Sequence, residues 1–134
     1  MTRYAGSLDT NVLLRALLND IPEQHNAAKA LIESAGVQYR VSDTALIELA
    51  FVLDRHYGFS REHIKEALKG LAAHPRLSCN SGVINESADA FASHPALSFE
   101  DCYLAHSAED TAALPFWTFD KKLASQCDQA ELVP

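Results

Sequence analysis

The hydrophobic positions of this chain recur mainly at helical spacing, and short apolar runs separate the helical stretches. Apolar side chains at i, i+3, i+4 and i+7 predict helices with one buried face, whereas short runs rich in β-branched and aromatic residues predict strands. We predict helices at 11–18, 22–35, 43–57, 61–73, 83–93, 98–110 and 121–125, and strands at 3–8, 37–41, 77–79, 114–119 and 131–133. Serine or aspartate precedes several of these helices, where a side-chain oxygen can cap the first turn.

Strands that alternate with helices pair in parallel, because each crossover helix returns the chain to the same edge of the sheet. The pattern therefore predicts an α/β fold in which helices cover both faces of a mainly parallel sheet of four or five short strands. A chain of 134 residues supports one hydrophobic core, so we expect one domain spanning 1–134.

The charge and the cysteines limit the chemistry that the chain can perform. Its net charge is −7, with 7 basic and 9 acidic side chains in residues 1–67 and 4 basic and 9 acidic in residues 68–134. A protein of this charge has no general basic surface, so a nucleic-acid substrate would need bound cations at the site. Three widely spaced cysteines without a CxxC pair predict neither a disulfide framework nor a zinc knuckle. Since no apolar run resembles a membrane span or a signal peptide, we expect a cytoplasmic protein.

Two aspartates follow directly after predicted strands. Asp9 stands after the first strand, and Asp120 stands after the fourth. Binding sites in open parallel sheets form beyond the carboxyl ends of the strands, so both positions suit a functional site. Aspartate before a helix is also a favoured N-cap, and each position taken alone leaves both interpretations open.

Two further acids lie within predicted helices. Glu48 is the only charged side chain in 44–53, a segment that is apolar nearly all round and is therefore expected to be buried. A buried carboxylate must be paired, protonated or bound to metal, and the alternatives are a buried basic partner or an exposed stripe along the helix. Asp101 begins an apolar helix face, whereas Glu100 points about 100° away and is expected to be solvated.

Four segments of the chain resemble, in order, the acidic motifs of PIN-domain nucleases, and most closely those of the VapC-type toxins of toxin–antitoxin pairs. The segments are LDTNVLL at 8–14, the lone Glu48, FEDCYLA at 99–105, and TFD at 118–120. The resemblance covers the chain from Asp9 to the last strand and rests on the order and spacing of the segments. It implies a PIN-like three-layer α/β/α sandwich. The chain departs from the family pattern in a small, polar first strand and in Cys102, where alanine is usual.

The resemblance implies that four carboxylates are catalytic and bind the metal, namely Asp9, Glu48, Asp101 and Asp120. Asn11 and Thr118 would support them. Oxygen ligands without histidine or cysteine favour Mg²⁺ or Mn²⁺ over zinc. One or two such ions would polarise an RNA phosphodiester and activate a water molecule for attack on phosphorus.

The resemblance also implies partners, namely an RNA substrate, a second copy in a homodimer, and a cognate antitoxin protein that blocks the acidic pocket. Four basic side chains are candidates to guide the phosphate backbone: Arg15, Arg55, Lys121 and Lys122. Ordinary solvated helix charge explains each of them equally well.

Two other functions remain open at this point. One is a PIN-like fold that has lost catalysis and acts as a binding module, although such a protein would usually have lost at least one of the acids. The other is a phosphatase of another α/β family, whose chemistry requires a second aspartate two residues after the nucleophile at the end of the strand. Asn11 occupies that position here.

Overall fold

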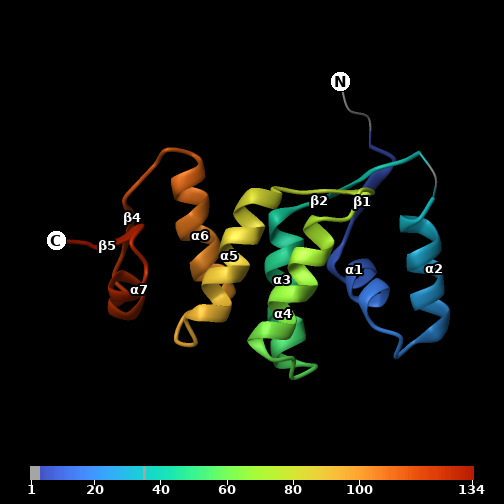
Figure 1. The fold of residues 1–134 in the computed structure, drawn as a ribbon, viewed down its shortest axis with the longest axis horizontal. Coiled ribbons are helices and arrows are strands. Elements are labelled where there is room, and N and C mark those ends of the chain that lie inside the picture. Colours follow the sequence, from blue (N-terminus) through green and yellow to red (C-terminus); the bar gives the residue numbers. More distant parts are fainter. Residues whose placement is uncertain (1–3, 35) are drawn as a thin grey trace.

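The computed structural model describes residues 4–34 and 36–134, in which helices and short strands alternate along the chain (Figure 1). The strands are β1 (Gly6–Leu8), β2 (Tyr39–Val41), β3 (Leu77–Ser78), β4 (Phe116–Thr118) and β5 (Ala130–Leu132). The helices are α1 (Thr10–Leu17), α2 (Pro22–Ile32), α3 (Asp43–Arg55), α4 (Arg61–Ala72), α5 (Ser81–Ser93), α6 (Phe99–Asp110) and α7 (Lys121–Gln126). None of the helices in these ranges is both long and apolar enough to cross a membrane.

Every predicted helix and strand is present, and the starts of the helices follow the predicted capping chemistry. Ser42, Ser60 and Ser98 each accept a hydrogen bond from the backbone N–H three residues ahead, at the starts of α3, α4 and α6. Gly58 follows the end of α3 with φ 63°, a left-handed conformation that glycine adopts without strain. Arg3 and Ala35, where one predicted strand begins and one predicted helix ends, lie outside the described residues.

The five strands form two separate parallel sheets. In the first, β2 lies between β1 and β3, with Gly6 opposite Tyr39 and Leu8 opposite Val41. In the second, β4 pairs with β5, with Phe116 opposite Ala130. We call β4, α7 and β5 together the C-terminal unit. The α/β fold class of short parallel strands flanked by helices is confirmed, with the strands divided between these two sheets.

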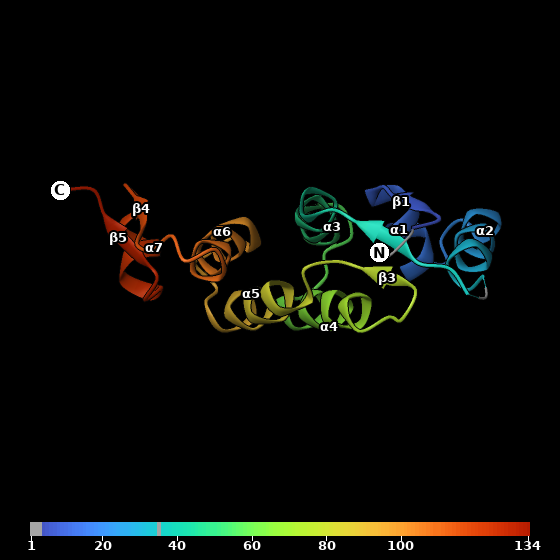
Figure 2. The same cartoon turned by 90° about the horizontal axis from the view of Figure 1, so that it is seen from above.

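The elements lie in a row in both views. The C-terminal unit stands at one end and α2 at the other, and α6 and then α3 lie between the C-terminal unit and β1 (Figures 1 and 2). The C-terminal unit packs on α6, where Leu123 and Ala130 are buried. A hydrogen bond of 2.6 Å from Gln129 Nε2 to Glu109 Oε2 joins this unit to the C-terminal end of α6.

The hydrophobic core is contributed mainly by one face of each helix. Its largest fully buried side chains include Leu13, Leu46, Leu49, Leu53, Ile64, Leu68 and Ile84. Arg61 ties α4 to the end of α5, because its guanidinium lies 4.1 Å from the centre of the Phe91 ring and donates to the carbonyl oxygen of Phe91 at 2.8 Å. The core thus holds α1, α3, α4 and α5 in fixed relative positions, and the candidate residues on α1 and α3 are positioned by it.

We expect Leu49→Ala to lower the free energy of unfolding by about 3 kcal/mol, because Leu49 has no exposed surface and its removal leaves a cavity. The matched control is Leu31→Ala, since Leu31 lies on α2 with 43% of its surface exposed. The control should change stability by less than about 1 kcal/mol. Urea unfolding followed by circular dichroism measures both values, and equal losses in the two variants would contradict this packing.

Candidate functional site

Asp9 lies at the junction between β1 and α1. Its side chain is exposed, and its Oδ1 accepts a hydrogen bond of 3.0 Å from the backbone N–H of Val12, so it is the N-cap of α1. The cap uses one carboxylate oxygen and leaves the other open to solvent. Capping and a functional role are therefore compatible at this residue.

Glu48 is exposed, and the prediction that it lies in a helix buried nearly all round is wrong. It belongs to a stripe along α3 at helical spacing with Thr44, Phe51 and Arg55, all of which are exposed. Phe51 has 56% of its surface exposed, and Arg55 lies over its ring at 5.5 Å. The sequence did not reveal this exposed stripe, because Phe51 is hydrophobic and hydrophobic positions of a helix are expected to be buried.

The packing of α1 against α3 brings Asp9 and Glu48 to one small hollow of about 210 Å³. Thr10 and Asn11 also line the hollow. The hydroxyl of Thr10 is within donating distance of both the carbonyl oxygen of Ala45, at 3.1 Å, and Oε2 of Glu48, at 3.3 Å. Thr10, the residue after Asp9, therefore contacts Glu48 through its side chain, a role that we did not predict.

A second, larger cleft of about 640 Å³ lies along the exposed stripe of α3. Its apolar wall includes Phe51, Phe91 and Phe99, and Glu48 lines it together with Glu100 from the first turn of α6. Glu48 thus borders both the hollow and the cleft. Glu100, which was expected to be merely solvated, shares this cleft with Glu48.

Asp101 lies in the first turn of α6 and is half-buried. Its backbone N–H donates to the Oγ of Ser98 at 3.1 Å, which caps the helix. The neighbouring Cys102 is almost fully buried, and this burial raises the pKa of its thiol to about 12, so it is a core residue rather than a reactive group. Of the apolar face that was predicted to share the side of Asp101, Ala105 is buried but Leu104 has 41% of its surface exposed, so that face is only partly directed at the core.

Asp120 lies in the C-terminal unit at the start of α7. Its Oδ1 accepts hydrogen bonds from the backbone N–H of Lys122, at 2.9 Å, and of Leu123, at 3.2 Å. Thr118 Oγ1 accepts a hydrogen bond of 2.9 Å from the backbone N–H of Asp120, so Thr118 supports this turn. Phe119, between them, has 82% of its surface exposed.

Within one chain the four predicted carboxylates do not form one cluster. The structure brings Asp9 and Glu48 to the same hollow, but nowhere in 4–34 and 36–134 do three acids, histidines or cysteines group closely enough to hold a metal ion. Mg²⁺ is commonly held by one or two carboxylates, with water and substrate phosphate as its other ligands, so the pair Asp9 and Glu48 with Thr10 and Asn11 suits such an ion. The predicted set of four carboxylates is not gathered at this hollow.

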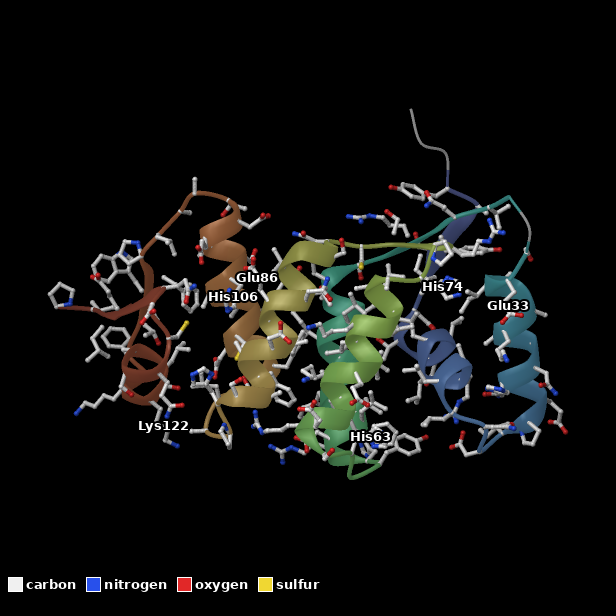
Figure 3. All side chains as sticks on the ribbon, in the orientation of Figure 1. Glu33, His63, His74, Glu86, His106 and Lys122 are labelled. Atoms are coloured by element: carbon white, nitrogen blue, oxygen red, sulfur yellow. The ribbon has the colours of Figure 1, made fainter. Side chains whose placement is uncertain are left out.

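The four basic candidates differ in their surroundings. Arg15 is bound to Asp20 at 2.7 Å, and this contact, with a further hydrogen bond from Tyr57, keeps the pKa of Asp20 below its usual value. Arg55 is exposed beside the larger cleft. Lys121 and Lys122 are exposed at the start of α7, and Figure 3 shows Lys122 at the opposite end of the molecule from Glu33 on the α2 side. Arg55 is exposed although it lies 3.9 Å from a carboxylate oxygen of Asp54, and Arg15 is held more closely by Asp20.

The sequence pattern of the PIN domain matches residues 7–128, which is most of the chain. The chain therefore belongs to the PIN-domain family, whose members are generally metal-dependent nucleases. No curated protein matches the chain. All four predicted acids fall within the matched range.

If Asp9 is both a cap and a functional acid, substitutions should separate the two roles. Asp9→Ala should destabilise the protein by about 1 kcal/mol, because the N–H of Val12 loses its acceptor. Asp9→Asn should cost only a few tenths of a kcal/mol, because asparagine caps as well as aspartate and only the charge near the helix dipole is lost. Thermal or urea unfolding measures both, and an equal loss in the two variants would show that the carboxylate charge itself stabilises the fold.

Proposed function

We propose that this protein is an endoribonuclease that hydrolyses RNA phosphodiester bonds with Mg²⁺ or Mn²⁺. Membership of the PIN-domain family carries the proposal, because it places all four acids within a fold whose members are generally nucleases. In this proposal Asp9, Glu48, Asp101 and Asp120 are the metal-binding and catalytic residues. Asn11 and Thr118 support the first and the last of them.

The donor chemistry supports a hard cation over zinc. The hollow beside Asp9 and Glu48 offers oxygen donors from carboxylate, hydroxyl and amide groups and holds neither histidine nor cysteine. Mg²⁺ and Mn²⁺ prefer such oxygens. A bound cation would also offset the negative charge of the chain where a phosphate approaches. Arg55, Lys121 and Lys122 are the exposed basic groups that we propose to guide the RNA backbone, with Arg15 a weaker candidate because Asp20 holds it.

The purified protein should cleave RNA in the presence of Mg²⁺ or Mn²⁺ and lose this activity in excess EDTA. Asp9→Asn should lower the cleavage rate by about 100-fold or more without unfolding the protein, because the cap survives while a carboxylate ligand is lost. Gel analysis of labelled RNA measures the rate, and Gln24→Cys on the exposed surface of α2 serves as a control with normal activity. Full activity in EDTA, or in Asp9→Asn, would overturn the metal mechanism or this site.

We further propose that the protein is the toxin of a toxin–antitoxin pair, acting in the cytoplasm as a homodimer. The support is the resemblance of its acidic segments to those of VapC-type toxins. The antitoxin would be a protein that covers the acidic surface around Asp9 and Glu48.

Expression of the chain alone should then arrest bacterial growth, and expression of Asp9→Asn at the same level should not. Colony counts after induction measure the effect. Co-expression with the product of a small adjacent gene should restore growth. Normal growth on expression of an active enzyme would leave a nuclease without a toxin role.

One observation favours a second candidate, a PIN-like binding module without catalysis. The acids of a single chain do not gather into a metal site within the described residues. The RNA cleavage assay separates the two functions, because a binding module would leave RNA intact at any metal concentration.

A further inference from the structure

The larger cleft, of about 640 Å³, is lined by residues of α3, α5 and α6, which contribute Phe51, Phe91 and Phe99 to its aromatic wall. In Figure 2, α3 and α6 lie on the same side of α5. Ligand sites in proteins typically have volumes of about 300–1,000 Å³ and combine apolar or aromatic walls with polar groups that orient the ligand. The cleft has this size, and charged side chains from α3 and α6 lie beside its aromatic wall. It therefore suits a ligand that is partly aromatic and partly charged.

Of the three phenylalanines in the wall, Phe51 is the one that a ligand can reach. It has 56% of its surface exposed, whereas Phe91 and Phe99 are almost fully buried. The ring of Phe91 is also covered by the guanidinium of Arg61, which lies 4.1 Å from its centre. A large exposed aromatic side chain at a concave site is a typical feature of a binding surface. Phe51 thus offers the cleft an open ring for stacking.

Two arginines line the cleft, and they differ in what they can bind. Arg61 is held by the fold, because it donates a hydrogen bond of 2.8 Å to the carbonyl oxygen of Phe91. The guanidinium of Arg55 lies 5.5 Å from the centre of the Phe51 ring. Its contact with Asp54 is 3.9 Å long, and both side chains are more than half exposed. Since exposed pairs of this kind contribute little energy, Arg55 can turn toward a phosphate.

We propose that this cleft binds an unpaired base of the RNA substrate, which stacks on Phe51 while Arg55 contacts a neighbouring phosphate. The proposal rests on the proposed nuclease function and adds a base-binding subsite to it. Proteins bind the bases of single-stranded RNA mainly by stacking them on aromatic rings and guanidinium planes. Glu48 lines both the cleft and the hollow beside Asp9. Because Phe51 follows Glu48 by about one helical turn, a strand with one phosphate at the hollow places a nearby nucleotide at Phe51.

The charges of the cleft favour a base over an apolar protein segment. Glu48, Asp54 and Glu100 all line it beside the aromatic wall. An apolar segment docked there would remove these carboxylates from water without giving them partners, which is costly. A base offers a flat ring for Phe51 and N–H groups along its edge, from which carboxylates accept hydrogen bonds. Its phosphate would stay at the rim, where Arg55 is exposed.

RNA binding tests the subsite directly. Fluorescence anisotropy of a labelled, unstructured RNA oligonucleotide in Mg²⁺ gives the Kd, with Asp9→Asn present in every protein so that cleavage is slow. Phe51→Leu should weaken binding about fivefold or more, because leucine has no flat face on which a base stacks, whereas Phe51→Trp should bind at least as tightly as its parent. The matched control is Tyr4→Leu, at an exposed aromatic residue outside the cleft, which should bind normally.

The salt dependence of binding separates the two parts of the subsite. Arg55→Ala should weaken binding and lower the slope of log Kd against log salt concentration by about 1, because one phosphate contact is lost. Phe51→Leu should leave this slope unchanged, because stacking releases no counterion from the RNA. Anisotropy titrations at several salt concentrations measure the slopes. A purely structural role of the two residues would not separate them in this way.

Equal affinities of Phe51→Leu and its parent would overturn the subsite, as would a parent that does not bind the oligonucleotide. A change in the molar mass of the protein on Phe51→Leu, measured by light scattering, would show that Phe51 contacts a second copy and would also overturn it. The nuclease function can fail separately. If the unsubstituted protein binds RNA through Phe51 but cleaves none in Mg²⁺ or Mn²⁺, the cleavage proposal is refuted and the base-binding subsite stands.

Discussion

A strand in a parallel sheet carries hydrogen-bonding groups along both edges, and the organisation of this protein depends on how β1 meets that requirement. Within the described residues β1 pairs on one side only, through its register with β2. Asp9 stands at the carboxyl end of this strand, and the start of α1 that it caps lies beside Glu48 of α3. The position of β1 therefore determines where the two acids meet.

The division of the acids between the ends of the molecule has an electrostatic consequence. Four carboxylates in one small space repel one another until cations arrive, and a chain of net charge −7 offers few basic neighbours to offset them. Of the four predicted acids, only Asp9 and Glu48 line this hollow, where the hydroxyl of Thr10 donates a hydrogen bond to Glu48. The arrangement of a single chain thus avoids most of this repulsion.

Local features were the ones that the sequence could predict. Ser42, Ser60 and Ser98 cap the helices that they precede, because capping depends only on neighbouring residues. The α/β class also followed from local periodicity. The division into two sheets did not, because whether strands more than 100 residues apart, such as β1 and β4, pair or stay separate is not set by local sequence. Glu48 was placed wrongly for a related reason: whether a phenylalanine such as Phe51 faces the core or solvent depends on what packs against α3.

Capping holds both strand-end aspartates in fixed positions. Asp9 and Asp120 each give a carboxylate oxygen to the backbone at the start of the next helix, which fixes the side chain whether or not a ligand is present. A functional acid on a free loop would have to be ordered when a ligand binds, at a cost in conformational entropy. Here that ordering is complete in each chain.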